Sequence, residues 1–121
     1  MEKISLKFRR EERLKKRNDI KAVFNKGKCV TCQGAKLFVL QNSLRFNRIG
    51  FTFPRKFGNA AQRNRARRLS REAYRHIGYT LKKGYDMVLL VYPAGKDAFK
   101  NRAEQMRILI SKAGLRQVYG N

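Results

Sequence analysis

The chain has 121 residues, with 30 Lys and Arg against 8 Asp and Glu, which gives a formal net charge of +22. This length suits one domain, and a hydrophobic content of 42% is enough for a folded core, so the charge does not by itself imply disorder. No run reaches the roughly 18 apolar residues that a membrane-spanning helix needs, and the basic start has no apolar signal segment, so we expect a soluble, cytoplasmic protein.

The first 17 residues are polar and basic, and their few apolar residues show little periodicity. We therefore expect a basic N-terminal arm over residues 1–17. A single α+β domain is predicted over residues 18–121, because no linker, repeat or low-complexity segment interrupts that part of the sequence.

A short helix is predicted at the start of this domain. Asn18 can cap it, and Gly27 suits the position after its last turn. Ile20, Val23 and Phe24 form its apolar stripe. Since about eight residues cannot hold a helix alone in water, this stripe must pack on a sheet.

Cys29 and Cys32 form a C-x-x-C motif, which is typical of half a zinc site or of a redox pair. The sequence has no second cysteine pair, and its one histidine, His76, lies far along the chain in a helical pattern. The flanking residues indicate a strand, on which positions three apart point to opposite faces. We therefore favour two reduced thiols, and we predict no metal site in the protein.

Four runs have the alternating or apolar character of strands. They are Cys29–Gln33, Ala35–Gln41, Arg45–Phe53 and Tyr85–Tyr92. In the third run Ile49, Phe51 and Phe53 share one face, and Pro54 ends the run. The fourth run is apolar on both faces, which predicts a central strand.

The segment from Gln62 to Ile77 has two chemically different faces when it is placed on a helical wheel. One narrow stripe is predicted to pack on the sheet: Gln62, Ala66, Leu69, Ala73 and Ile77. The opposite face is polar and basic: Asn64, Arg67, Arg68, Arg71 and Arg75. Arg63 and Arg65 flank the apolar stripe near the N-terminal end.

A final helix is predicted from the stripe of Ala103, Met106, Ile110 and Ala113, with Asn101 and Glu104 at the spacing of a capping box. The predicted order of elements is therefore α-β-β-β-α-β-α. This order indicates an α+β fold, a two-layer sandwich with one sheet of about four strands.

The basic helix is expected to bind a phosphate backbone. A merely solvated face would carry both signs of charge, because like charges at i,i+4 destabilise a helix, yet Glu72 is the one acid between Arg63 and Arg75. Arginine forks bind phosphate in bidentate fashion, and so large a charge excess attracts nucleic acid more plausibly than a membrane. Phe24 and Phe38 beside a sheet favour irregular or single-stranded RNA over DNA, although core packing is an equal explanation for each aromatic.

The stretch "FGNAAQRNRARRLSREAYR" resembles the protein subunit of bacterial ribonuclease P, whose signature is R-N-R followed by basic residues and R-E on one helix. The segments "RLKKRNDIKAVFNKG", "RIGFTFPRKFGNA" and "KKGYDMVLLVYPA" extend the resemblance over about residues 13 to 115. It implies the same order of elements with a left-handed crossover around the arginine helix. It also implies a ribonucleoprotein endonuclease whose RNA subunit removes the 5′ leader of precursor tRNA.

Carried over by position, the resemblance assigns two sets of binding residues and no catalytic residue. The catalytic-RNA contacts would be Arg63, Asn64, Arg65, Arg67, Arg68 and Arg71. The leader contacts would be Phe24, Phe38, Arg55 and Lys56. One aromatic common in the family, a turn before Phe24, is here Ile20.

The implied partners are the catalytic RNA and precursor tRNA, with no membrane and one protein monomer per RNA. Mg²⁺ would act in the holoenzyme, held mainly by RNA phosphates, and the protein would bind none tightly. Two other readings remain open at this point: a structural RNA-binding protein of ribosomal type, and a basic DNA-binding protein.

Overall fold

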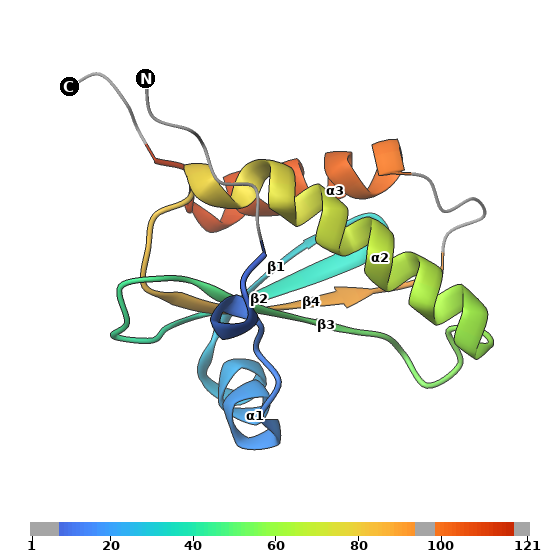
Figure 1. Ribbon diagram of the computed structural model, residues 1–121, viewed down its shortest axis with the longest axis horizontal. Coiled ribbons are helices and arrows are strands. Elements are labelled where there is room, and N and C mark those ends of the chain that lie inside the picture. The colour runs from blue at the N-terminus through green and yellow to red at the C-terminus, as the bar shows by residue number, and fades with distance from the viewer. Residues whose placement is uncertain (1–7, 94–98, 118–121) are drawn as a thin grey trace.

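Figure 1 shows the computed structural model, which describes residues 8–93 and 99–117. The order of elements is the predicted one, and the α+β class is confirmed. Two 3-10 turns, η1 and η2, are added to it. The elements are η1 (Arg10–Glu12), α1 (Arg17–Lys26), β1 (Lys28–Cys32), β2 (Ala35–Gln41), β3 (Arg48–Thr52), α2 (Ala60–Ile77), η2 (Gly78–Thr80), β4 (Tyr85–Val91) and α3 (Phe99–Ala113).

The four strands form one mixed sheet in the order β1-β2-β4-β3. β2 pairs antiparallel with both β1 and β4, while β3 and β4 are parallel, with Ile49 opposite Met87. β4 is therefore a central strand, as its apolar faces predict. The helix α2 connects the two parallel strands, and the hand of this crossover stays a prediction.

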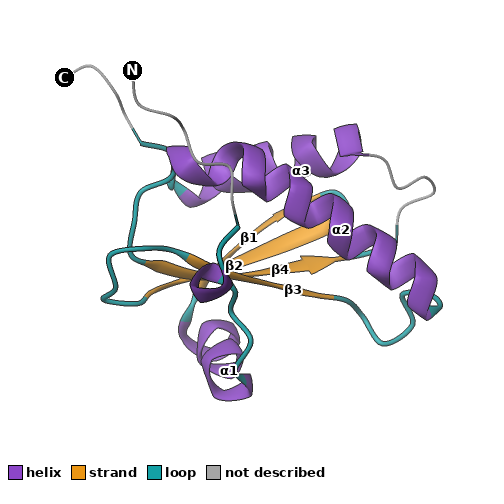
Figure 2. Ribbon diagram, viewed as in Figure 1, coloured by secondary structure: helices purple, strands orange, loops and turns teal. Residues whose placement is uncertain are grey.

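The helices cover both faces of the sheet (Figure 2). On one face α2 and α3 enclose the larger core, which contains Leu37, Met87 and Leu109. On the other face α1 encloses a smaller core of Leu14, Val23 and Val88. The predicted two-layer sandwich is therefore incomplete, because α1 adds a third layer. Within the described ranges, no helix is long and apolar enough to cross a bilayer.

The predicted ends of α1 need correction. The helix begins at Arg17, so Asn18 lies inside its first turn and Lys16 occupies the N-cap without a side-chain hydrogen bond. Gly27 does follow the helix, but its backbone is extended, with φ −77°. Glycine is needed there because a Cβ atom would lie 2.4 Å from the Val23 carbonyl oxygen.

The predicted capping box of α3 is also wrong. The helix begins at Phe99, so Asn101 is its third residue, and Glu104 pairs instead with Arg107 on the next turn. The predicted stripe is nevertheless on the buried side, since Met106 and Ile110 are buried.

The strand β3 starts three residues later than predicted, because the Asn47 side chain ties the preceding loop to the backbone near β4. Its amide nitrogen donates to the Lys82 carbonyl oxygen at 2.8 Å, and its amide oxygen accepts from the Tyr85 N–H at 2.9 Å. These contacts fix the loop against the start of β4, so residues 45–47 do not join the ladder.

The described part of the predicted N-terminal arm lies against the sheet. Leu14 is buried, and its N–H donates to the Ile49 carbonyl oxygen at 3.0 Å. Arg13 forms an isolated parallel bridge with Ile49. Residues 1–7 lie outside the described residues, and the boundary at residue 17 stays a prediction.

The two cysteines are free thiols on β1. Cys29 is exposed, and it is paired in the ladder with Phe38. Cys32 packs against the larger core, and burial raises the pKa of its thiol above the ordinary value. The strand alternation thus separates the two sulfur atoms onto opposite faces, as the spacing predicts.

Candidate nucleic-acid interface

The helix α2 begins with a capping box that the sequence analysis missed. The Asn59 side chain accepts from the Gln62 N–H at 2.8 Å, and the Gln62 side chain accepts from the Asn59 N–H at 2.9 Å. Gln62 is therefore an exposed capping residue, and its predicted place on the core stripe is wrong.

The buried side of α2 is formed by Ala66, Ser70, Ala73 and Tyr74. Ala66 and Ala73 were predicted there, while Leu69 and Ile77 are half-buried at the margins. Tyr74 was missed. Its ring makes an edge contact with the Phe8 ring, with centroids 5.7 Å apart. Phe8 in turn makes an edge contact with Phe51, with centroids 6.3 Å apart.

The polar face of α2 forms one wall of an open basic cleft of about 730 Å³. The other wall is the N-terminal segment, which passes between α1 and α2 in Figure 1. The cleft is lined by Phe8, Arg9, Arg13, Asn64, Arg67, Arg68, Arg71, Glu72 and Arg75. The five residues predicted on the polar face therefore share one site.

Four of the six predicted catalytic-RNA residues line this cleft: Asn64, Arg67, Arg68 and Arg71. The other two, Arg63 and Arg65, lie outside its lining, and Arg63 donates from Nη1 to the Gly58 carbonyl oxygen at 2.7 Å. The N-terminal contributions were missed, because a polar segment without periodicity gives no signal of where it packs.

The charge of the cleft is only partly balanced. Glu72 accepts from Arg75 at 2.7 Å and lies 3.3 Å from His76, which is exposed as predicted. Burial, followed by repulsion from Arg13 and Arg67, lowers the pKa of Arg71 below its usual range. Such crowding of guanidinium groups suits the binding of an anionic polymer.

The two predicted leader aromatics meet on the other face of the sheet. Phe24 on α1 and Phe38 on β2 form an edge contact with centroids 4.7 Å apart, and Phe24 is 36% exposed. Ile20 packs behind them in the smaller core. Arg55 and Lys56 are exposed in the loop between β3 and α2, and no hydrogen bond or ring contact between described residues links them to the pair.

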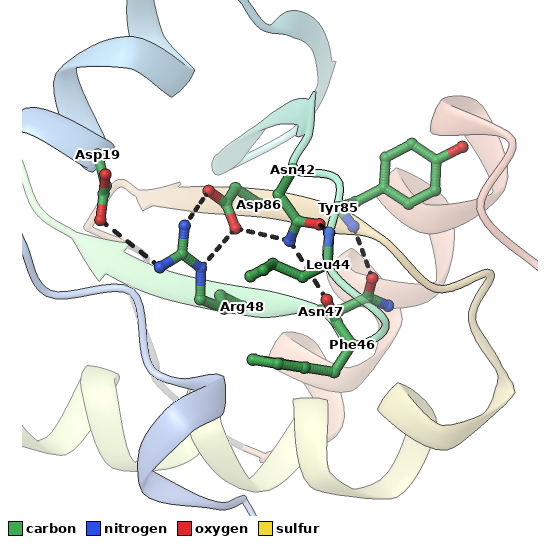
Figure 3. A network of polar contacts seen from close by, with 8 residues as sticks. All are labelled: Asp19, Asn42, Leu44, Phe46, Asn47, Arg48, Tyr85 and Asp86. Carbon is green, nitrogen blue, oxygen red and sulfur yellow. Dashed lines mark hydrogen bonds and ion pairs between the residues drawn. The ribbon is translucent and has the colours of Figure 1, made fainter.

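A polar network fixes α1 over the sheet (Figure 3). Arg48 on β3 donates twice to the Asp86 carboxylate on β4, at 2.8 Å and 2.6 Å, and its Nη1 lies 3.6 Å from Asp19 on α1. Asn42 also donates to Asp86, at 2.9 Å. The Asp86 hydrogen bond raises the pKa of Arg48 above its ordinary value. The network thereby joins the helix that carries Phe24 to two strands.

The chain is similar to known proteins along most of its length. A family model described as Ribonuclease P matches residues 8–114. The ribonuclease P protein component of Clostridioides difficile (strain 630) is 34% identical over 110 residues, which cover 89% of this chain and 96% of that relative. The component of the same name from Thermoanaerobacter sp. (strain X514) is 34% identical over 104 residues, with 85% and 90% covered.

Solved structures give the same picture of the fold. The RNase P protein from Thermotoga maritima matches with a TM-score of 0.73 and 28% identity, over 84% of this chain and 96% of that one. The RNase P protein of Staphylococcus aureus matches with a TM-score of 0.79 over 88% and 98% of the two chains. At 21% identity, the latter supports the fold alone.

Proposed function

The chain belongs to the ribonuclease P protein family, and from this premise we propose that its basic cleft holds the catalytic RNA while its aromatic pair contacts the 5′ leader of precursor tRNA. The chain is a subunit of the ribonucleoprotein endoribonuclease that processes tRNA. A structural protein of ribosomal type is not favoured.

The observation that carries the proposal is the single cleft that gathers Asn64, Arg67, Arg68 and Arg71. These side chains come from successive turns of one helix, whose opposite side is buried in the core. A rigid row of guanidinium groups can grip phosphates at little cost in side-chain entropy, because the helix already sets their spacing. Arg63 and Arg65 would contact the RNA beyond the margin of the cleft.

The leader would lie on the opposite face of the sheet. Phe24 is partly exposed beside Phe38, and bases of any sequence can stack on such rings. Arg55 and Lys56 would neutralise leader phosphates from the neighbouring loop. Contact with RNA on two faces would let one small protein bridge the catalytic RNA and its substrate.

The chemistry would remain with the RNA. Five of the eight acids lie within ion-pair distance of an arginine, namely Glu11, Asp19, Glu72, Asp86 and Glu104, so we assign Mg²⁺ mainly to RNA phosphates. One protein per catalytic RNA and a cytoplasmic location are parts of the same proposal.

The direct test is cleavage of precursor tRNA at low Mg²⁺ by a bacterial ribonuclease P RNA, with and without the protein. We expect strong stimulation with correct 5′ ends, and no cleavage by the protein alone. Tight RNA binding without stimulation would contradict the proposal.

Leader contact needs a separate measurement on the assembled holoenzyme. Phe24→Leu should reduce the preference for precursor over mature tRNA, because it removes an exposed ring without opening the core. The matched control is Leu44→Ala, which alters another exposed apolar residue, in the loop before β3. An unchanged preference in Phe24→Leu would contradict binding of the leader on this face of the sheet.

A further inference from the structure

The N-terminal segment is held tightly where it crosses β3. The Leu14 N–H donates to the Ile49 carbonyl oxygen at 3.0 Å, and Arg13 bridges the same residue. A Cβ atom at Gly50 would lie 2.7 Å from the Leu14 carbonyl oxygen, so glycine permits this approach. The backbone at Arg13 is therefore held in place by its contacts with β3, which restricts where the Arg13 side chain can lie.

Three guanidinium groups converge beside this crossing. The Arg13 guanidinium lies 5.4 Å from the Phe8 ring centroid, and that of Arg67 lies 5.1 Å from the Phe53 centroid. Arg71 lies beside both arginines, and burial, followed by repulsion from Arg13 and Arg67, lowers its pKa. With Lys15, these three arginines line a small cavity of about 140 Å³, and the described residues around that cavity include no carboxylate.

Two of the three arginines have buried donors without a partner. The Nε atoms of Arg13 and Arg71 are both inaccessible to solvent and make no hydrogen bond within the described structure. Leaving such a donor unsatisfied destabilises the folded protein, and more so when the group is charged. A buried donor without a partner calls for an explanation, and an ion bound beside the group is one.

The nearby acids already have other partners. Glu72 is engaged by Arg75 and His76. The Glu12 carboxylate accepts from the Arg9 N–H at 3.4 Å. An oxyanion held between the guanidinium groups of Arg13, Arg67 and Arg71 would offset the repulsion between them.

We propose that Arg13, Arg67 and Arg71 together hold one phosphate group of the bound RNA backbone, so that Arg13 is a binding residue supplied from outside α2. The inference rests on the proposed function, since it names one contact within the basic cleft. The ligand class is a phosphate group, and the source is an internal phosphodiester of the RNA.

The first experiment uses inorganic phosphate as the probe, added to the full chain at constant ionic strength. The Nε–H signals of Arg13 and Arg71 in NMR spectra should shift together and saturate. Arg13→Ala should abolish the saturable shift of Arg71, while Arg45→Ala, which removes an equal charge from an exposed loop, should not. Weak shifts spread over all arginines would mean an adventitious ion only, and would overturn the site.

The second experiment measures affinity for the catalytic RNA in a double-mutant cycle of Arg13→Ala and Arg71→Ala. Each single change should weaken binding roughly 10- to 100-fold. If both residues hold one phosphate, the double variant should lose little more than the worse single variant. Additive losses would overturn the shared site while leaving the proposed function intact.

Folding must be controlled in both experiments. Where Arg13→Ala fails to fold, Arg13→Lys keeps the charge and removes the Nε donor. It should weaken the saturable phosphate shift at Arg71 without changing the free energy of unfolding. Full retention of the shift in Arg13→Lys would contradict the role assigned to the guanidinium. If the unaltered chain binds no catalytic RNA, the proposed function itself fails.

Discussion

At the scale of single residues, Asp86 shows how a carboxylate is kept within the sheet. Its side chain is 8% exposed, and it accepts from Arg48 and Asn42. The two partners come from β3 and from the loop after β2, so the carboxylate joins parts of the chain that are far apart in sequence.

Asp86→Ala is expected to lower the free energy of unfolding by about 3 kcal/mol, because it leaves the Arg48 charge and the Asn42 amide without their partner. Urea unfolding of the protein would measure this loss. Glu104→Ala breaks the exposed pair with Arg107 and is the matched control, with an expected loss of less than about 1 kcal/mol. Equal losses would show that burial does not set the strength of the Asp86 contacts.

Tyr74 gives a prediction about pH. Burial, and secondarily the nearby Glu12, raise the pKa of its hydroxyl above the ordinary value of about 10. The unfolded chain therefore loses this proton first, so the stabilisation is complete below about pH 10 and is lost as the pH rises toward the folded pKa. Between about pH 9 and 11, Tyr74→Phe should show a shallower loss of stability than the unaltered chain, by up to about 1.4 kcal/mol per pH unit.

The measurement is denaturant unfolding at a series of pH values. Tyr79→Phe, which changes an exposed tyrosine, is the control. Parallel pH profiles for Tyr74→Phe and the unaltered chain would refute the assignment to Tyr74.

At the scale of elements, α2 depends on a defined start. Asn59→Ala should lower the free energy of unfolding by about 1 kcal/mol, because it removes the acceptor for the Gln62 N–H. Asn59→Asp should retain most of that stability, since aspartate also caps a helix and its charge complements the helix dipole. Thermal or urea unfolding would check both variants, with Asn25→Ala, inside α1, as the control for loss of an exposed asparagine. No loss in Asn59→Ala would contradict the capping role.

The elements that could be predicted from sequence are those with a strong local period. Ala35–Gln41 was placed at its observed ends, and the basic face of α2 was found because a helical wheel fixes relative angles. The wheel does not say where the sheet lies, so Gln62 was misplaced and the burial of Tyr74 was missed. The Arg48–Asp86 pair joins positions 38 residues apart. The packing of Arg13 depends on its bridge to Ile49, which is also distant in sequence, and neither contact leaves a local signal.

At the scale of the whole molecule, the charge of +22 predicts how binding depends on salt. The logarithm of affinity for the catalytic RNA should fall linearly with the logarithm of salt concentration, by ~0.7–0.9 for each phosphate contacted. Arg68→Ala should reduce this slope by about one contact, and Arg45→Ala should not. Filter binding at several salt concentrations would measure the slopes. An affinity that hardly changes with salt would contradict the electrostatic account.

The crossing of the N-terminal segment over β3 also bears on aggregation. An open sheet edge offers unpaired backbone groups to another chain, and charge repulsion between copies weakens once RNA neutralises it. Here the Arg13–Leu14 backbone covers part of the β3 edge, while at the opposite edge the Lys112 ammonium donates to the Thr31 carbonyl oxygen at 2.7 Å. Both edges are thus partly blocked by contacts within the protein that do not depend on its net charge. Part of each edge therefore stays closed to strand addition when RNA neutralises the charge of the protein.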